Sequence, residues 1–378
     1  MNDISAPLHA SYIDTPEGLD DLCSALKGQP WIALDTEFMR EDTYYPRLCL
    51  LQLAAPGTIA CVDPLALTQA QLDPLLDILY ESSVTKIFHA CHQDMEIFHL
   101  LRNELPSPVF DTQIAAPLLG YPVQASYARL VEEVLGTKLE KAHTRTDWSR
   151  RPLSSEQLDY AADDVRFLGP LYLDLRRRLE ERGMLAWLEE DFTATTGPTR
   201  YRSDPQSAWL RVRGTQRMSG QQLAVLRELA AWRESAAQRA NRPRGWLLRD
   251  DALIEIASRM PAGIEELQEI RGLSRQMLNR HGEALLTAIA AGRKASPAPT
   301  PRGRPAPLDE AEERLYTGMS QATARRAAEL GIDAATLASR GDLVDLIRGN
   351  EPCRLLSGWK RAAIGEELLR LRAAVLKD

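Results

Sequence analysis

The chain has 378 residues, of which 44% are hydrophobic and 26% are charged, and this length and composition predict two or three globular domains. We expect no signal peptide, because the N-terminus lacks a basic start and an apolar core, and no membrane span, because no apolar run is long enough. The five cysteines are scattered and lack C-x-x-C spacing, which argues against a disulfide framework and a zinc finger and indicates a reducing cytoplasm.

The net charge of −7 is unevenly distributed along the chain. Residues 200–304 contain 19 Lys and Arg against 10 Asp and Glu, a net charge of +9, which leaves −16 for the remainder. Such an asymmetry suggests a division of labour in which an acidic part holds cations and a basic part holds polyanions.

Residues 1–195 mix strand and helix patterns and predict an α/β domain with a mixed sheet. The strand candidates are 31–38, 47–55, 58–65 and 84–90, and helical periodicity dominates from there to about residue 190. The second and third candidates are separated by a turn sequence that includes Pro56-Gly57, which predicts a β-hairpin.

Two carboxylates stand at the end of the first strand candidate, WIALDTEF. Asp35 and Glu37 are two residues apart, so in a strand both side chains leave the same face. Like charges at that spacing repel each other unless a cation lies between them. The stretch therefore predicts a divalent-metal site, and further oxygen ligands must come from elsewhere in this domain.

The best source of such ligands is PLSSEQLDYAADDVRFLGP, where Ser154 and Gln157 have the spacing of a capping box that begins a helix. Tyr160 and Asp164 then lie on one helix face, and Asp163 is a rival at three residues from the tyrosine. By itself, such a tyrosine is most often a residue packed in a core.

A second source is FHACHQDMEIFHLL, where a strand passes into a helix with Asp94 near its start. The simpler alternative is that Asp94 only complements the helix dipole. Asp111, in VFDTQIAAPLL, is interpreted as a helix N-cap, because an apolar helix begins directly after it.

From residue 207 onward the sequence is helical in character. Residues 195–206 have the turn chemistry of a domain boundary, 207–291 form one helical block, and 295–308 are Pro-rich and predict an extended linker. A last helical block runs from 309 to the C-terminus. The two blocks have similar size, which leaves open a distant duplication without a clean repeat.

Four stretches in order resemble ribonuclease D, a family of DEDD-type 3′-5′ exonucleases with an RNase H-like core. They are DTEF, FHACHQDMEIF, FDTQIAA and RTDWSRRPLSSEQLDYAADDVRFL. The Tyr-x-x-x-Asp spacing of the family selects Asp164 over Asp163 and marks the tyrosine subgroup, since the sister subgroup would have His at position 159, where this chain has Asp159.

The resemblance also implies the domain organisation. It divides the chain into an exonuclease domain (1–200), a first HRDC domain (207–291), a Pro-rich linker (292–308) and a second HRDC-like domain (309–378). HRDC domains are small helical nucleic-acid-binding modules, and the second match is the weaker one. The implied fold class is thus an α/β RNase H-like domain followed by two small all-α domains.

In the family scheme the catalytic residues are Asp35, Glu37, Asp94, Tyr160 and Asp164, and the four acids hold two divalent ions, Mg²⁺ or Mn²⁺. Asp35 is expected to bridge both ions, Glu37 and Asp164 to complete the ion that activates water, and Asp94 to serve the ion near the leaving 3′-oxygen. Because an unperturbed phenol has a pKa near 10, Tyr160 is expected to orient the attacking water rather than to act as a base.

Other residues are weaker candidates. His89, His92 and His99 crowd the second motif, but they lack helical metal-ligand spacing and are interpreted as loop or core residues. Tyr44, Tyr45 and Arg47 could hold the RNA 3′ end, or the tyrosines could belong to a core. In the basic block a Gly-Leu turn opens a helix, a suitable place for phosphate. The arginines around this turn, which could bind RNA phosphates, are Arg271, Arg275 and Arg280. The alternative interpretation is that they only form a solvated basic face.

The leading hypothesis is a hydrolytic 3′-5′ exoribonuclease that releases 5′-mononucleotides from RNA with a free 3′ end, such as a tRNA precursor. No membrane and no obligate protein partner are expected. A proofreading-type DNA exonuclease of the same fold and a non-catalytic RNA-binding adaptor are the alternatives, and the intact carboxylate set argues against the adaptor. The missing G-x-x-x-x-G-K-[ST] loop excludes a helicase.

Overall fold

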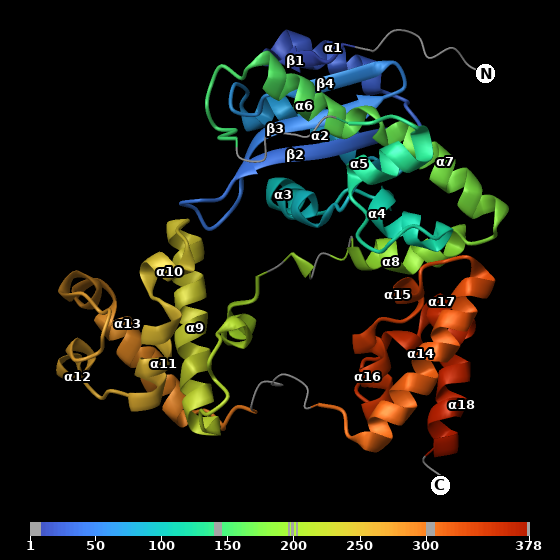
Figure 1. Cartoon of the computed structure of the whole chain (residues 1–378). Coiled ribbons are helices and arrows are strands. Elements are labelled where there is room, and N and C mark those ends of the chain that lie inside the picture. Colours follow the sequence, from blue (N-terminus) through green and yellow to red (C-terminus); the bar gives the residue numbers. More distant parts are fainter. Residues whose placement is uncertain are drawn as a thin grey trace. The chain divides into compact units, whose positions relative to one another are not determined.

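The structure, a computed structural model, describes residues 9–139, 146–195, 197, 200–201, 203–299 and 307–375. The chain divides into two compact units. The α/β unit comprises Met1–Phe38, Leu48–Tyr201 and Leu308–Asp378, and the helical unit comprises Met39–Arg47 and Arg202–Pro307 (Figure 1). In the described part of the chain, no helix combines the length and the apolar character needed to cross a bilayer.

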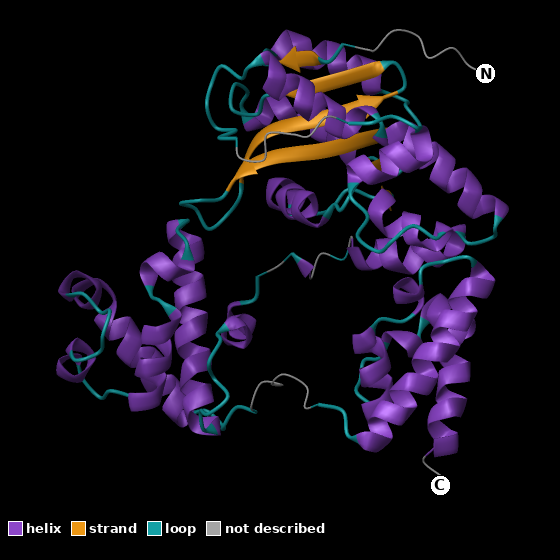
Figure 2. Cartoon of the chain, in the orientation of Figure 1, coloured by secondary structure: helices purple, strands orange, loops and turns teal. Residues whose placement is uncertain are grey.

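A six-stranded sheet forms the centre of the α/β unit (Figure 2). Its strand order is β1-β4-β3-β2-β5-β6. The strands are β1 (Ser11–Ile13), β2 (Trp31–Met39), β3 (Arg47–Ala55), β4 (Thr58–Val62), β5 (Thr85–Phe88) and β6 (Val109–Asp111). The predicted hairpin is confirmed, because β3 and β4 pair antiparallel, with Ala55 opposite Thr58. β1 pairs parallel with β4, and β5 pairs parallel with both β2 and β6. The predicted mixed sheet is therefore confirmed.

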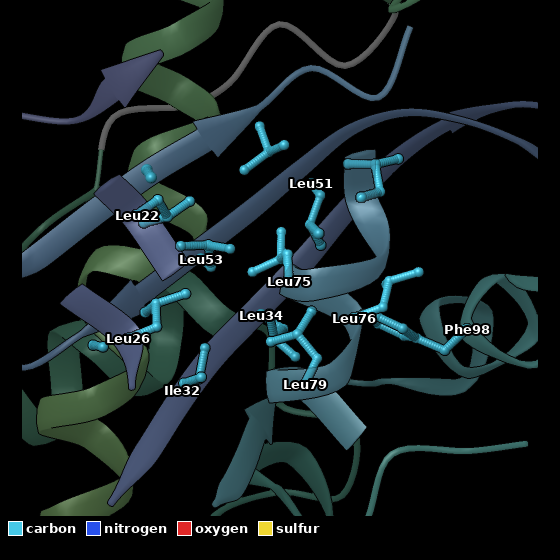
Figure 3. Close-up of a cluster of buried hydrophobic side chains, with 14 of the residues drawn as sticks. Leu22, Leu26, Ile32, Leu34, Leu51, Leu53, Leu75, Leu76, Leu79 and Phe98 are labelled. Atoms are coloured by element: carbon cyan, nitrogen blue, oxygen red, sulfur yellow. The ribbon is translucent and has the colours of Figure 1, made fainter. Parts of the chain in front are cut away.

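One face of this sheet is covered by a cluster of hydrophobic side chains from the strands and from the helices that follow them (Figure 3). Leu34 in β2 is fully buried and packs in this cluster with Leu75 and Leu79 of α2 (Gln69–Tyr80). Phe98 of α3 (His92–Arg102) belongs to the same cluster. This packing holds one face of β2 rigidly in place, and it therefore also fixes the backbone of the residues that follow Leu34.

Helices surround the sheet and continue into the C-terminal part of the α/β unit. Those before the helical unit are α1 (Pro16–Leu26), α2 (Gln69–Tyr80), α3 (His92–Arg102), α4 (Thr112–Ala115), α5 (Tyr127–Leu130), α6 (Ser155–Arg166), α7 (Leu168–Glu181) and α8 (Leu188–Thr195). Those after it are α14 (Glu310–Leu330), α15 (Ala334–Leu337), α16 (Arg340–Arg348), α17 (Gly358–Lys360) and α18 (Glu366–Val375).

The C-terminal helices pack against the part of the unit that contains the sheet. The rings of Trp187 and Trp359 stack with centroids 4.8 Å apart and planes 7° from parallel. The amide of Asp333 donates a hydrogen bond to the carbonyl of Pro117 (3.1 Å). These contacts explain why residues 308–378 belong to the same compact unit as the sheet.

The helical unit consists of α9 (Gly220–Ala240), α10 (Arg244–Leu247), α11 (Asp250–Arg259), α12 (Ile264–Gln268) and α13 (Arg275–Lys294), preceded by a 3₁₀ segment (Pro205–Arg211). Its core is formed by aliphatic residues such as Leu226, Leu253 and Leu285, all fully buried. The predicted helical character of this block is confirmed. Within the predicted Pro-rich linker, residues 300–306 lie outside the described residues.

The contact between α7 and β2 gives a test of the packing. A Cβ on Gly169 would overlap the ring of Trp31, so Gly169→Ala forces the helix away from the strand. We expect a loss of about 1–3 kcal/mol of unfolding free energy, the usual cost of overpacking a core, measured by chemical denaturation. Gly318→Ala is the matched control in the same unit, because a Cβ at this exposed position inside α14 meets no neighbour. The control should gain about 0.5–1 kcal/mol, and a Gly169 variant that behaved like it would contradict the packing described here.

Candidate active site

Three carboxylates from two elements converge beside the second half of β2, because the strand continues past both acids to Met39. Asp35 and Glu37 lie in β2, and Asp164 lies in α6. Each offers one carboxylate oxygen, and these oxygens all lie within 4.8 Å of one another. All three side chains are partly buried. The capping box predicted for the third motif is present, because Ser154 and Gln157 cap each other at the start of α6.

Burial and mutual repulsion disfavour ionisation of this cluster. Burial, and then the charges of Asp94, Asp164 and Glu37, raise the pKa of Asp35 well above its usual range. Burial, with Asp164 and Asp94, raises the pKa of Glu37 to about 8, and burial raises the pKa of Asp164 to about 7. Oxygen donors held this close without a counter-charge are a suitable ligand set for a hard divalent cation.

Asp94 lies beside this cluster but is held by a different partner. It is buried in the first turn of α3, and its Oδ1 accepts a hydrogen bond from the Thr36 hydroxyl (2.6 Å). Burial raises the pKa of Asp94 to about 6. Its charge acts on both Asp35 and Glu37, so it belongs to the same electrostatic centre although it is not one of the three converging carboxylates.

Asp111 places the turn that leads to Asp94. It caps α4 by accepting from the amide of Gln113, which confirms the N-cap interpretation. It also accepts from the amides of Ala90 (3.0 Å) and Cys91 (2.9 Å), directly before α3. Ala90 has φ 62°, in the left-handed region that costs an alanine about 1–2 kcal/mol, so the two hydrogen bonds stabilise an unfavourable turn.

Tyr160 and Asp164 point toward each other from one face of α6. The charge of Asp164 acts on the Tyr160 hydroxyl, and the tyrosine ring stacks on that of Trp148, with centroids 6.2 Å apart. Burial, and then the charge of Asp164, raise the pKa of Tyr160, which keeps the phenol protonated. The rival Asp163 instead forms an ion pair with Arg166 (2.7 Å).

Sequence reasoning missed a partly buried ion pair that anchors the chain before α6. Arg151 donates to both carboxylate oxygens of Asp63 (2.5 and 2.7 Å) and to the carbonyls of Cys49 and Trp148. Although burial opposes it, hydrogen bonds from Arg151 and Tyr12 lower the pKa of Asp63. The pair spans 88 residues, so no local pattern could reveal it.

The three histidines of the second motif do not converge on one point. His89 Nδ1 lies 2.9 Å from the Thr112 hydroxyl, while the rings of His92 and His99 lie beside Tyr201. Among the described residues, the group that could hold a metal ion is the one formed by the three carboxylates.

The proposed RNA contacts occur in two separate places in the helical unit. Tyr44 packs edge-on against Tyr45, and its hydroxyl donates to Glu234 of α9. Arg47 is exposed at the start of β3. The Gly-Leu turn is present, with Gly272 at φ +89° and α13 beginning just after it. The arginines around this turn, Arg271, Arg275 and Arg280, are all exposed.

Comparison with known families matches two parts of the chain. The family of 3′-5′ exonuclease domains matches residues 10–180, and the HRDC domain family matches residues 222–289. The first match contains the three motifs, and the second lies within the helical unit.

Relatives match nearly the whole chain. Ribonuclease D of Granulibacter bethesdensis is 40% identical over 372 residues, which cover 96% of this chain and 92% of the relative. Ribonuclease D of Pseudomonas paraeruginosa is 36% identical over 97% of this chain and 98% of its own. The crystal structure of Escherichia coli RNase D, described as an exoribonuclease involved in structured RNA processing, has a TM-score of 0.83 at 32% identity. It covers 97% of this chain and 99% of that one.

The raised pKa of Glu37 predicts a pH-dependent stability in the absence of metal. Between its ordinary value of 4.5 and its folded value of about 8, the folded state binds more protons than the unfolded state, so this group lowers stability as pH rises. In EDTA, Glu37→Gln should therefore unfold at a higher temperature than the parent at pH 8. A gain of about 1 kcal/mol corresponds to about 2–4 °C, and it should vanish near pH 4.

Calorimetric unfolding at several pH values measures this difference, with Glu180→Gln, an exposed carboxyl on α7, as the control. The control variant should show a pH-independent difference from the parent. A Glu37→Gln variant that is less stable than the parent at pH 8 would contradict the repulsion inferred for the cluster.

Proposed function

The chain belongs to the ribonuclease D family and is a 3′-5′ exoribonuclease, and we propose that the acids of its three motifs and one tyrosine form the hydrolytic centre. These residues are Asp35, Glu37, Asp94, Asp164 and Tyr160. The observation that carries the proposal is the convergence of three carboxylate oxygens within 4.8 Å, two from β2 and one from α6. The domain division into 1–200, 207–291, 292–308 and 309–378 is part of the same proposal.

The exonuclease fold implies divalent metal ions, and the residues present fit them. Carboxylates whose pKa is raised by burial and then by neighbouring charges gain most from a cation, and an all-oxygen ligand set suits Mg²⁺ or Mn²⁺. We propose that Asp35, Glu37 and Asp164 are direct ligands and that Asp94 serves a second ion. When bound, such ions lower the pKa of water and neutralise charge on the phosphate.

The chain's own residues orient the reaction. The Tyr160 hydroxyl stays protonated, so it acts as a hydrogen-bonding group beside Asp164 and holds the attacking water rather than removing its proton. Stacking on Trp148 limits rotation of the tyrosine ring. Thr36 fixes the Asp94 carboxylate by a 2.6 Å hydrogen bond, and Asp111 holds the turn before it.

The substrate is RNA, and the finer identity is an inference. We propose a structured RNA with a free 3′ end, such as a tRNA precursor, and release of 5′-mononucleotides. The E. coli relative is described as acting in structured RNA processing, which supports this substrate class. We place the protein in a reducing cytoplasm, because all five cysteines are free thiols in the structure.

The first catalytic prediction concerns Asp35. Asp35→Asn should reduce hydrolysis of 3′-labelled RNA by at least about a thousandfold, because it removes a ligand from the centre of the carboxylate cluster. Asp163→Asn is the control: it lies next to Asp164, yet its carboxylate is taken by Arg166. The control should keep most of the activity. Comparable activity of Asp35→Asn and the parent, at matched unfolding temperature, would remove the metal assignment.

The second catalytic prediction concerns Tyr160. Tyr160→Phe keeps the ring on Trp148 and removes only the hydroxyl, so kcat should fall about 10²-fold or more while RNA affinity stays unchanged. Single-turnover kinetics and RNA binding in the presence of Ca²⁺ separate the two quantities. A weaker RNA affinity with an unchanged kcat would place Tyr160 in substrate binding instead.

A further inference from the structure

The helical unit contains a pocket of about 490 Å³ that none of the site residues above lines. Six residues line it: Arg211, Arg233, Arg244, Gly245, Arg249 and Asp250. They come from the 3₁₀ segment and from α9, α10 and the start of α11, and Figure 1 shows α10 and α11 lying along α9. Four guanidinium groups thus face one lining carboxylate.

Arg233 forms the base of this pocket. Its side chain is buried, and its Nη1 donates to the carbonyl of Leu248 (2.8 Å) and to Asp250 (2.7 Å). Its Nε has no hydrogen-bond partner among the described residues. Asp250 is therefore already engaged by Arg233, and it does not neutralise the other three arginines.

A second carboxylate, Glu234, lies behind Arg211 and Arg244. Its side chain is fully buried, and it accepts from the hydroxyls of Tyr44 and Ser203. Arg244 lies 3.3 Å from this carboxylate and Arg211 3.9 Å, so Glu234 orients both arginines. With Asp251 beside Arg249, three carboxylates stand against four guanidinium groups, which leaves an excess of one positive charge in a concave site and favours an anion there.

The remaining arginine is the most exposed member. Arg249 is the N-cap residue of α11, and no side chain caps this helix. Its side chain is 79% exposed, and its carboxylate neighbour, Asp251, lies at 3.7 Å. The first turn of α11 already contains Asp250 and Asp251, and Asp251 accepts from the amide of Ala252, so the attraction for an anion here comes from the guanidinium groups and not from the helix N-terminus.

An exposed aromatic ring stands next to the pocket in the chain. Trp246 follows the lining residue Gly245 in α10 and is 65% exposed, the highest among the large hydrophobic residues that are exposed in the described chain. The Arg242 guanidinium lies 5.8 Å from its ring centroid. A solvent-facing indole beside an arginine pocket is suited to stacking on a nucleic-acid base.

We propose that this pocket binds a backbone phosphate of the RNA and that Trp246 stacks on an adjacent base. The inference rests on the proposed function, because RNA is the polyanion that this protein holds. The site differs from the exposed arginines near Gly272 and from the hydrolytic centre, and it assigns a particular single-strand contact to the helical unit.

The test measures binding rather than hydrolysis, with the full chain carrying Asp35→Asn. Fluorescence anisotropy with a labelled single-stranded RNA gives the affinity at several salt concentrations. The double variant Arg211→Gln/Arg249→Gln should lower the salt dependence of log K by roughly 0.7 for each phosphate that the pocket no longer neutralises. Both side chains are well exposed, so the variant should fold, and its unfolding temperature checks this.

Trp246→Ala should weaken RNA binding about tenfold with an unchanged salt slope, since stacking releases no counterions. Trp246→Phe should retain most of the affinity. Arg217→Gln, an exposed arginine of the same unit that does not line the pocket, is the matched control and should keep the parent salt slope. Parent-like affinity and slope for the folded double variant would overturn the proposal.

Two further experiments are needed. The first distinguishes RNA from a free phosphate compound as the ligand of the pocket, and the second distinguishes failure of this inference from failure of the proposed function. Inorganic phosphate and ADP are titrated by calorimetry, and we expect at most weak binding. Micromolar binding of either that the double variant abolishes, with RNA affinity unchanged, would assign the pocket to a free phosphate compound and overturn the RNA contact. Hydrolysis of a dinucleotide by the parent chain tests the proposed function alone, so the two failures remain distinct.

Discussion

Repulsion among partly buried carboxylates is the constraint on which the rest of the α/β unit depends. Asp35, Glu37 and Asp164 hold their oxygens within 4.8 Å although burial and neighbouring charges raise each pKa. A flexible segment would separate such groups, so the cluster exists only because rigid elements hold it. The sheet core beneath β2 and the capped helix α6 supply that rigidity.

The supporting contacts share one property, which is that each joins segments distant in the chain. Asp111 stabilises the turn before α3, 20 residues earlier in the chain, and Arg151 joins the chain before α6 to the end of β4 through Asp63. The packing of Trp148 on Tyr160 adds a third restraint on α6. The active-site geometry is therefore a property of the whole unit rather than of the motifs alone.

The sequence allowed the longer elements and the motif acids to be predicted, because both have local signals. Alternation placed Asp35 and Glu37 on one face of β2, and capping chemistry placed the start of α6. The three-residue strands β1 and β6 were missed, because three residues are too few to show an alternation of apolar and polar side chains. The second role of Asp111 and the Asp63 ion pair were also missed, because their partners are set by tertiary structure.

The exchange of segments between the two units has a consequence for the order in which the chain folds during synthesis. The connecting segment Met39–Arg47 belongs to the helical unit, and Leu308–Asp378 belongs to the α/β unit, so neither unit is a single continuous stretch. Tyr44 and its hydrogen-bond partner Glu234 are 190 residues apart, so Glu234 is synthesised about 10–40 s after Tyr44 at ordinary translation rates. The α/β unit therefore cannot be completed until its last segment, Leu308–Asp378, has been synthesised, after the whole helical unit.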